Sequence, residues 1–450
     1  MGSEWSELSG SDERSVPDTG DEKPVLARLQ QIANPTTGII TGIKRIPVPP
    51  DEPAIEAFVA EREDFAPVTD GQAMAHEEGG GAFTTAAARI ATYGEAIERY
   101  CGCVYRADAF RRAAYDELQE SAIDPTAVVN FSQNQREAMD RRNDLCGPTD
   151  ELSWVAGDAL HTGETAFVPA QLVYLSYPPS EEPFIRNPIS SGLAAGESRE
   201  MAVRNGLCEL VERDAFVSYY LTETELPVID PASGPPRIRR LVDRVTPNGL
   251  ELTLLDATTD LGVPVGIAVL VDRNTQPAVT VAAAAGVDAA GVIESALAEV
   301  AQTRLSAIHR LDNTAQTPDD IDAGEITGYA DRGLFWAAHD RISDLDFWIE
   351  SDRETSSSEF GMNTGENCDP VEQVTAAGYE SYAVDVTTRD MSNLGVSVQR
   401  VVAPRLQPLY LVEQLRYFGG NRLYETPVKM GYRDSEPSDG DLNTVPHPFP

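Results

Sequence analysis

A short acidic phrase recurs along the chain. Residues Glu95–Arg99 read E-x-x-E-R, and residues Glu209–Arg213 repeat the same pattern. Residues Glu299–Arg304 read E-x-x-Q-x-R. Because residues three apart share one face of a helix, each phrase points two oxygen-bearing side chains the same way. Adjacent carboxylates repel each other and favour a divalent cation between them. Oxygen ligands suit Mg²⁺, which commonly accompanies the phosphates of a nucleotide.

The helix expected around the second phrase has a polar stripe. On a helical wheel, Asn205, Glu209, Glu212 and Phe216 fall close together, and most other positions of this helix are apolar. A surface helix shows the reverse pattern, with one apolar stripe. A single E-x-x-E-R phrase is more often an exposed helix face paired with arginine. Three related phrases on similarly apolar helices favour buried carboxylates, which must be paired or must bind a metal.

Two glycine-containing stretches precede these helices. Ser190–Gly196 comes before the second phrase, and Gly79–Gly81 comes before the first. Backbone N–H groups at a helix N-terminus can hold phosphate, so either stretch is a candidate phosphate cradle. Neither is followed by the GKS or GKT of a Walker A loop, and taken alone each is more often a tight connection. The histidines and the five cysteines form no pattern typical of zinc or of a cysteine nucleophile.

The sequence predicts a mixed α/β, or α+β, architecture. Helices are expected over about 84–105, 198–221 and 291–309, with Thr84 and Ser198 as candidate N-caps. Extended β-branched runs predict strands over 252–256, 263–271, 278–283, 382–386 and 396–402. A polar stretch over 351–367 is expected to be a surface loop.

The composition is strongly acidic. The 450 residues carry a formal net charge of -38, and only Lys23, Lys44 and Lys429 among the 35 basic residues are lysine. Acidic residues are spread along the whole chain, which favours a halophile's cytoplasm, where salt screens the self-repulsion. Binding of nucleic acid through a basic stripe is disfavoured. We expect neither a signal peptide nor a membrane-spanning segment.

The chain is expected to contain three regions. Residues 1–27 form an acidic tail predicted to be disordered, and residues 28–433 form a single large catalytic domain. Residues 434–450 form a C-terminal tail that ends in P-x-P-x-P at Pro446–Pro450. Such a segment is stiff and costs little entropy to order, although chain ends commonly fray. A ligand for an SH3-like domain is a further alternative.

These patterns together resemble the YcaO family of ATP-dependent enzymes that activate peptide backbones. The densest match runs from Ser190–Gly196 into Asn205–Ala215, and Tyr93–Tyr100 and Glu299–Arg304 support it. Weaker matches lie at 37–40, 168–170 and 384–387, so the resemblance covers the chain from about residue 28 onward.

The resemblance implies ATP and Mg²⁺ as cofactors, in a cleft lined by helices. The Mg²⁺ ligands that it implies are Glu95, Glu98, Glu209 and Glu212. The nucleotide-binding residues that it implies are Ser190, Asn205, Arg99, Arg213, Glu299 and Gln302. It implies Arg213 and Pro450 as catalytic residues. Pro450 is included because the tail of azoline-forming members reaches toward the active site.

The expected activity follows from the same resemblance. We expect cyclodehydration of Cys, Ser or Thr in a ribosomally made precursor peptide, which forms azoline rings. Backbone thioamidation with the same ATP chemistry is one alternative, and a non-catalytic peptide-binding scaffold is another. The resemblance also implies a separate precursor-binding partner protein. The sequence leaves open whether the chain forms a homodimer.

Overall fold

The computed structural model describes residues 22–66, 69–71, 77–118, 122–138, 145–178, 182–361 and 368–449. The strands within these ranges form three sheets. The first is antiparallel, in the order β1 (Ile40–Arg45), β2 (Glu56–Arg62), β3 (Glu77–Ala82). The second has the order β11 (Val279–Ala285), β10 (Val265–Val271), β9 (Glu251–Asp256), β8 (Val228–Asp230), β12 (Glu354–Ser356). The third has the order β4 (Arg111–Ala114), β5 (Glu151–Ala159), β13 (Tyr382–Asp385), β14 (Ser397–Val402), β7 (Leu193–Gly196), with β6 (Thr165–Pro169) beside β5.

Three long helices carry the acidic phrases. They are α2 (Thr85–Cys103), α6 (Arg199–Leu221) and α8 (Ala289–Asn313). The shorter helices in the described ranges are α1 (Glu22–Leu29), α3 (Tyr115–Leu118), α4 (Gln133–Ala138), α5 (Ala170–Val173), α7 (Pro236–Val245), α9 (Tyr329–Phe335), α10 (Asp346–Ile349), α11 (Pro370–Ala376), α12 (Arg389–Asn393) and α13 (Asn421–Lys429). Within these ranges, no helix combines the length and apolar character needed to cross a membrane.

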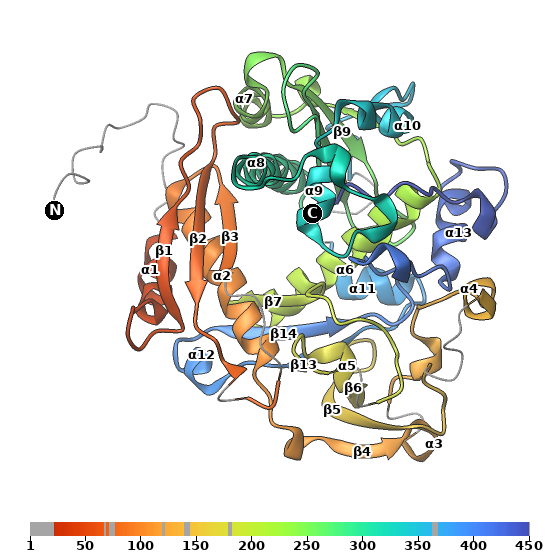
Figure 1. The fold of residues 1–450 in the computed structure, drawn as a ribbon. Helices are drawn as coiled ribbons and strands as arrows, with labels where there is room; N and C mark the ends of the chain where they lie inside the picture. Colours follow the sequence, from red (N-terminus) through yellow and green to blue (C-terminus); the bar gives the residue numbers. More distant parts are fainter. Residues whose placement is uncertain are drawn as a thin grey trace.

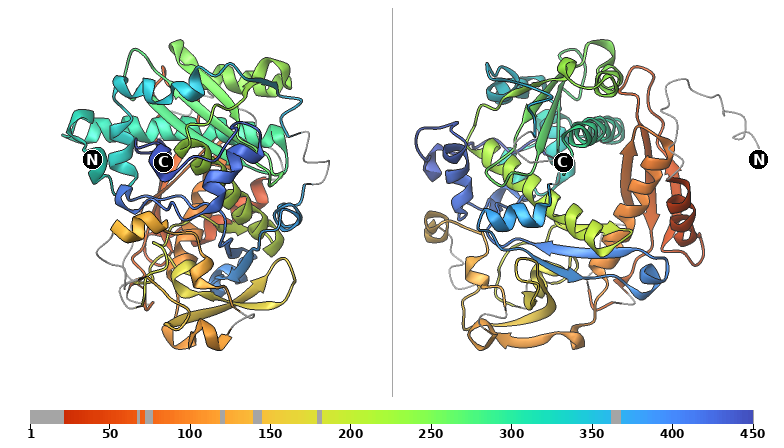
Figure 2. Two further views of the ribbon diagram at one scale, coloured as in Figure 1. Left: turned by 90° about the vertical axis from the view of Figure 1, so that its right-hand side faces the viewer. Right: turned by 180° about the vertical axis from the view of Figure 1, so that it is seen from behind.

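The sheets surround the three long helices. Helix α2 packs on β2 and β3, α8 packs on β10 and β11, and α6 runs between β7 and β14 on one side and β11 on the other. Figures 1 and 2 show α2, α6 and α8 converging on the centre of the molecule, near the C-terminus. Strand β10 is buried along its whole length because α6 and α8 both cover it. The mixed fold predicted from the sequence is confirmed.

The helix starts follow local hydrogen-bond chemistry. Thr84 Oγ1 accepts from the Ala87 N–H at 3.1 Å, and Ser198 Oγ accepts from the Met201 N–H at 3.2 Å. Both residues therefore act as the N-caps expected from the sequence. Helix α8 begins two residues earlier than predicted, because Asp288 caps it by accepting from the Gly291 N–H at 2.8 Å. The predicted strands are present with small shifts at their ends.

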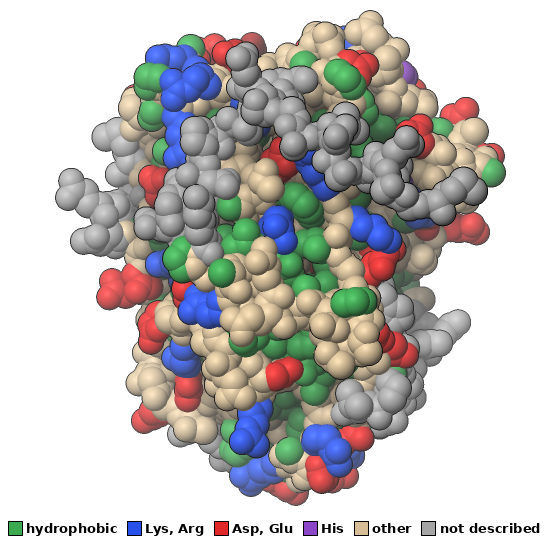
Figure 3. Space-filling model, turned by 90° about the vertical axis from the view of Figure 1, so that its left-hand side faces the viewer, with side chains coloured by type: hydrophobic (Ala, Val, Ile, Leu, Met, Phe, Trp, Pro, Cys, Tyr) green, Lys and Arg blue, Asp and Glu red, His purple; other side chains and the backbone are tan. Residues whose placement is uncertain are grey.

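Two regions differ from the sequence-based expectation. Part of the stretch 351–367 is the short strand β12, which pairs in parallel with β8, and residues 362–367 lie outside the described ranges. Residues 22–27 of the segment expected to be a tail belong to α1, and residues 1–21 lie outside the described ranges. The acidic side chains on the face drawn in Figure 3 are scattered, as their distribution in the sequence indicates.

The triple glycine Gly79–Gly81 allows close packing. These residues lie in strand β3, where a Cβ on Gly80 would come within 2.4 Å of the Thr92 backbone nitrogen on α2. A Cβ on Gly81 would come within 2.8 Å of the Gln302 side chain on α8. The glycines therefore let one strand lie against two site-bearing helices. The packing gives them a different role from the phosphate cradle considered from the sequence.

We predict that Gly80→Ala destabilises the protein by roughly 1–3 kcal/mol, because the added methyl group overpacks the contact between β3 and α2. Gly94→Ala is the matched control in α2, where a Cβ would meet nothing within 4 Å. Removing a glycine from a helix interior should stabilise the protein by about 0.5–1 kcal/mol. Denaturant unfolding in molar KCl measures both changes. Equal effects of the two substitutions would contradict the packing role of Gly80.

Candidate functional site

The three long helices and strand β7 line one cleft, with a cavity volume of about 700 Å³. Every site residue predicted from the sequence lines it, apart from Pro450, which lies outside the described residues. These are Glu95, Glu98, Arg99, Ser190, Asn205, Glu209, Glu212, Arg213, Glu299 and Gln302. Residues more than 200 positions apart in the sequence thus meet at one place. The structure brings them together, and their individual roles stay predictions.

The arginine of each E-x-x-E-R phrase is paired with its glutamates. Arg99 contacts Glu95 at 2.5 Å, and Arg213 contacts Glu209 at 3.2 Å and also pairs with Glu212. Arginine pairing on an exposed helix face and a buried carboxylate cluster are the two alternatives expected from the sequence. Each is present in part, because the ion pairs lie in the cleft, where Glu212 is buried while Glu95 and Glu209 are partly exposed.

Backbone groups hold two more carboxylate oxygens. The Ala195 N–H donates to Glu98 Oε1 at 2.7 Å, and the Gly192 N–H donates to Glu209 Oε2 at 3.0 Å. Both N–H groups belong to the stretch Ser190–Gly196, which the sequence offered as a candidate phosphate cradle. These two donors are occupied by glutamates, so they orient the acidic phrases. At the N-terminus of α6, Arg199 pairs with Asp158, and no residue of that first turn lines the cleft.

Burial and mutual repulsion shift the ionisation of three glutamates. Burial raises the pKa of Glu98 well above its ordinary value, and the neighbouring Glu95 carboxylate adds to the effect. Burial likewise raises the pKa of Glu212 strongly, although Arg213 opposes the shift. Burial raises the pKa of Glu299 to about 7, opposed by Arg213 and reinforced by Glu209. The cleft therefore holds more negative charge than its paired arginines neutralise.

The cleft fits a hard cation by its donor chemistry. Its glutamates provide oxygen ligands, and burial with neighbouring carboxylates raises the pKa values of Glu98, Glu212 and Glu299, so added positive charge would favour their ionised forms. Among the described residues, no three His, Cys, Asp or Glu side chains already lie close enough together to hold a metal ion. Arg99 and Arg213 occupy oxygens of Glu95, Glu209 and Glu212, so a cation that bound these carboxylates would replace part of the ion pairing.

The C-terminal segment reaches the cleft. Pro448 and Phe449 line it, and the Phe449 ring lies 4.1 Å from the Arg213 guanidinium carbon. Phe449 is fully buried and also contacts the Phe216 ring at 4.6 Å. The alternative of a frayed chain end is therefore wrong for residues 446–449, because they are buried and Phe449 makes apolar and cation–π contacts. Phe216 completes the predicted stripe of α6 by packing against this segment.

Sequence reasoning missed other residues of the cleft. Tyr329 and Gly333 of α9 line it beside Arg310 of α8. Burial raises the pKa of the Tyr329 hydroxyl, and Arg213 and Arg99 lower it, so the hydroxyl lies near both phrases. Helix α9 follows an acidic loop and carries no acidic phrase, so its sequence gave no signal. Phe449 had a signal, since it lies inside the P-x-P-x-P segment.

A second cavity, of about 1240 Å³, adjoins the first. The two share Gly79, Glu95, Glu299 and Gln302 in their walls, so they are direct neighbours. The second cavity extends between α2, α7 and α8, where α7 contributes three arginines: Arg237, Arg240 and Arg244.

A family model described as "YcaO cyclodehydratase, ATP- and Mg²⁺-binding" matches residues 79–407. This is most of the chain. The chain belongs to the YcaO family. The matched range contains all three acidic phrases, and it ends before the C-terminal segment.

Solved structures share the fold. A heterocyclase in complex with substrate and cofactor is 24% identical, with a TM-score of 0.77, and the match covers 95% of this chain and 57% of that one. The heterocyclase TruD is 22% identical, with a TM-score of 0.65, over 95% of this chain and 54% of that one. YcaO from Methanopyrus kandleri, bound with AMPPCP and Mg²⁺, is 21% identical, with a TM-score of 0.61, over 86% and 90%. At these identities the likeness establishes the fold.

Two curated relatives are closer in sequence. An uncharacterised protein of the tfuA 3′ region in Rhizobium leguminosarum bv. trifolii is 36% identical over 202 residues, which cover 40% of this chain and 47% of the relative. An uncharacterised protein of Methanothermobacter thermautotrophicus is 31% identical over 253 residues, or 54% and 61%. The chain thus spans about half to three-fifths of the length of these relatives.

We predict that Glu299→Gln stabilises the protein at pH 8 by roughly 1–2 kcal/mol, since each pKa unit corresponds to about 1.4 kcal/mol and water partly screens the half-buried side chain. The pKa of Glu299 is about 7 in the folded protein, whereas the ordinary value for a glutamate is 4.5. The contribution of Glu299 to the free energy of unfolding therefore decreases as the pH rises between these two values. Glutamine does not ionise, so the variant lacks this decrease.

Denaturant unfolding of both proteins at pH 4.5 and pH 8 measures the effect. The gain should be small at pH 4.5, where Glu299 is largely protonated. Asp312→Asn, an exposed change near the end of the same helix, is the control and should show no such difference. A gain for Glu299→Gln that is the same at both pH values would contradict the electrostatic account.

Proposed function

We propose that this chain binds Mg-ATP in the cleft between α2, α6 and α8 and uses it to activate a peptide backbone amide. One observation carries the proposal: three helices direct five glutamates into one cleft, and two arginines pair with three of those glutamates. Membership of a family whose model is described as ATP- and Mg²⁺-binding supports it. A triphosphate alone would be repelled by such a cluster, so the proposal requires the metal together with the nucleotide.

The residues that would hold Mg²⁺ are Glu95, Glu98, Glu209 and Glu212. When bound, the metal supplies positive charge that stabilises the transferring phosphoryl group. Ser190, Asn205, Glu299 and Gln302 line the same cleft and would contact the nucleotide or the metal's ligands. Arg99 and Arg213 would move part of their pairing from the glutamates to phosphate oxygens, where arginine binds well.

The protein's own part in catalysis is to place charges and exclude water. Glu98 and Glu209 accept from fixed backbone N–H groups, so their orientation costs little reorganisation. Arg213 is held between two glutamates and the Phe449 ring, which restricts its guanidinium. Burial lowers the pKa of His447 well below its ordinary value, so this ring near the cleft stays neutral.

The reaction we propose is cyclodehydration of a precursor peptide. A Cys, Ser or Thr side chain attacks the preceding backbone carbonyl, and the carbonyl oxygen then takes the γ-phosphoryl group of ATP. The side chain loses its thiol or hydroxyl proton, the backbone nitrogen loses its N–H proton, and the oxygen leaves as inorganic phosphate, which gives an azoline ring and ADP. The ordered terminal segment beside Arg213 supports ring formation, and we propose Pro450 and Arg213 as its catalytic residues.

Two alternatives remain outcomes of the test. In backbone thioamidation a sulfur nucleophile takes the place of the side chain, so the product gains sulfur and no ring forms. A non-catalytic scaffold would bind peptide without turnover. The proposal also includes a separate protein that presents the precursor peptide. Mass spectrometry of a modified peptide separates loss of water from exchange of oxygen for sulfur.

We predict that the wild-type protein binds the non-hydrolysable analogue Mg-AMPPCP in molar KCl, and that Glu209→Gln/Glu212→Gln weakens binding at least about tenfold. Removing two metal ligands deprives the nucleotide of its counter-charge. Glu200→Gln is the control, because this residue is exposed in the first turn of the same helix. Isothermal calorimetry with and without Mg²⁺ measures the affinities.

The folded state of each variant is checked by its unfolding transition. Unchanged affinity in the double variant would contradict the assignment of α6 to the metal side of the cleft. Binding that is equally strong without Mg²⁺ would contradict the requirement for a cation. Absence of binding by folded wild-type protein would favour the scaffold, or a site completed only by the partner.

A further inference from the structure

We propose that Arg332 is a positioning residue that links the cleft to the C-terminal segment Asn443–Phe449. The inference rests on the proposed nucleotide site. It adds a device that neither the family match nor the acidic phrases indicate. Arg332 lies on α9 and both lines the cleft and contacts the terminal segment.

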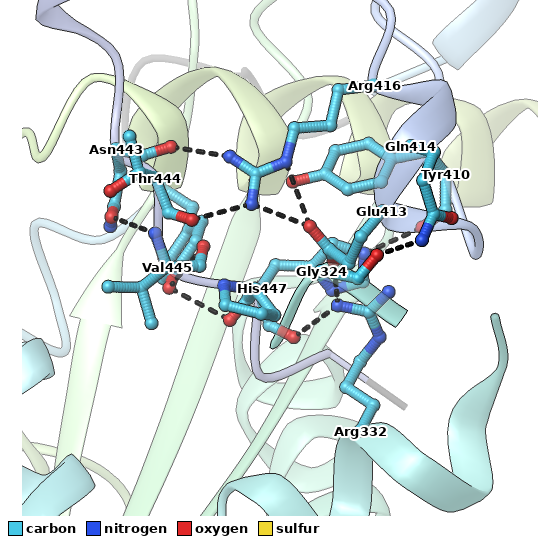
Figure 4. Close-up of polar contacts among 12 residues, drawn as sticks. Gly324, Arg332, Tyr410, Glu413, Gln414, Arg416, Asn443, Thr444, Val445 and His447 are labelled. Carbon is cyan, nitrogen blue, oxygen red and sulfur yellow. Dashed lines mark hydrogen bonds and ion pairs between the residues drawn. The ribbon is translucent and has the colours of Figure 1, made fainter. Parts of the chain in front are cut away.

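The terminal segment is held through its backbone carbonyl groups. Side chains donate to five consecutive carbonyls, those of residues 443–447. Prolines lack the N–H group, so a proline-rich segment cannot join a sheet through a full set of backbone bonds. Its carbonyls therefore remain available to donors from other elements. Figure 4 shows this arrangement around Arg332 and Arg416.

Arg332 and Arg416 hold opposite ends of this carbonyl series. Arg416 donates to the carbonyls of Asn443 and Thr444, each at 2.8 Å. Arg332 donates to the carbonyl of His447 at 2.9 Å. Both arginines pair with the same carboxylate, that of Glu413, with contacts of 2.6 Å. Glu413 therefore fixes the two donors relative to each other.

Aromatic donors on α6 and α9 hold the middle of the series. Tyr220 donates its hydroxyl to the carbonyls of Val445 and Pro446 at 3.3 and 3.1 Å. Trp336 Nε1, just after the end of α9, donates to the Pro446 carbonyl at 2.9 Å. Each of these donors is almost fully buried. The segment is thus fixed between α6, α9 and the loop that carries Glu413.

The residues in and just after α9 that hold the terminal segment also belong to the cleft wall. Tyr329, Ala330 and Gly333 line the cavity together with Arg332 and Trp336. At the other end of the segment, Phe449 covers Arg213, which pairs with Glu209 and Glu212. A displacement of α9 would therefore move both the wall of the cleft and the residue that packs on Arg213.

A purely stabilising role explains these contacts less well. A buried ion pair often contributes little compared with an apolar replacement of the same volume. What the arrangement does provide is a defined place for each carbonyl, since charge-assisted hydrogen bonds are strongly directional. Arg332 is 1% exposed and joins a carboxylate, two backbone carbonyls and the cleft wall. We infer that it sets the position of the segment relative to the nucleotide site.

The test compares wild type with Arg332→Gln, Arg332→Lys and Arg416→Gln. In the Arg332 variants Glu413 keeps Arg416 as a partner, so no carboxylate is left alone. Hydrogen exchange measured by mass spectrometry reports the order of residues 443–449 with and without Mg-AMPPCP. We expect nucleotide to slow exchange there in wild type but not in Arg332→Gln. Exchange without nucleotide should rise roughly tenfold or more in that variant, as expected for loss of a charge-assisted hydrogen bond.

Affinity and turnover provide the second readout. In Arg332→Gln and Arg416→Gln, the affinity for Mg-AMPPCP should stay within about threefold of the wild-type value. The rate of ATP turnover should fall about tenfold, because a displaced terminal segment affects the reacting state and not the binding of nucleotide. Arg332→Lys should recover part of the turnover. Arg416 does not line the cleft. If Arg416→Gln loses ATP turnover as Arg332→Gln does, the loss would therefore have to act through the terminal segment.

Arg422→Gln is the control for a merely structural arginine. Arg422 is also 1% exposed and ion-paired, to Asp214 and Asp260, and it lies outside the cleft. The Arg422→Gln substitution should lower the unfolding temperature of the protein without a selective change in hydrogen exchange at 443–449. The proposal would be overturned if hydrogen exchange at 443–449 were the same in Arg332→Gln as in wild type. It would also be overturned if bound nucleotide left this exchange unchanged in wild type. Absence of nucleotide binding by wild type would instead contradict the proposed function. The role of Arg332 would still be tested in that case, by hydrogen exchange at 443–449 without nucleotide.

Discussion

Excess negative charge in a partly enclosed cleft is the constraint on which the rest of the structure depends. Five glutamates from α2, α6 and α8 converge there, and two arginines balance only part of their charge. Buried carboxylates are unfavourable unless they are paired, hydrogen-bonded or bound to metal. The fold meets this requirement with arginine pairs and backbone N–H donors, and the remaining imbalance appears in the raised pKa values. A divalent cation with its nucleotide would complete the site.

The supporting elements are arranged to keep this cluster rigid. The glycines of β3 allow the strand to approach both α2 and α8. The N–H groups of Ala195 in β7 and of Gly192 just before it donate to the glutamates of α2 and α6. The terminal segment then packs Phe449 against Arg213. Each contact comes from a different part of the chain. The geometry of the cleft is therefore a property of the whole domain and not of a single motif.

Much of the site could be predicted because it follows helical spacing. The wheel that grouped Asn205, Glu209 and Glu212 needed only the repeat of an α-helix, and all three line the cleft. That helices far apart in sequence would meet was an inference from their shared pattern and from the family resemblance. The N-caps Thr84 and Ser198 were predictable from local hydrogen bonding.

Other features depend on long-range contacts that carry no local pattern. Tyr329 lines the cleft because α9 packs beside α8, and nothing in its immediate sequence indicates this. Gly79–Gly81 suggested a phosphate cradle, but the strand's approach to Thr92 and Gln302 requires those glycines. Arg332 could be identified only once the carbonyls of the terminal segment had been located.

The most direct measurement of the central claim is the number of protons released when preformed Mg-AMPPCP binds at pH 7. Calorimetry in buffers with different ionisation enthalpies gives this number. A cation bound to the neighbouring glutamates would lower the pKa of Glu299, which at about 7 leaves this group partly protonated at that pH. The account predicts net release of protons by wild type, reduced in Glu299→Gln. An observed enthalpy that does not depend on the buffer would contradict the claim that excess buried carboxylate charge is what the cation satisfies.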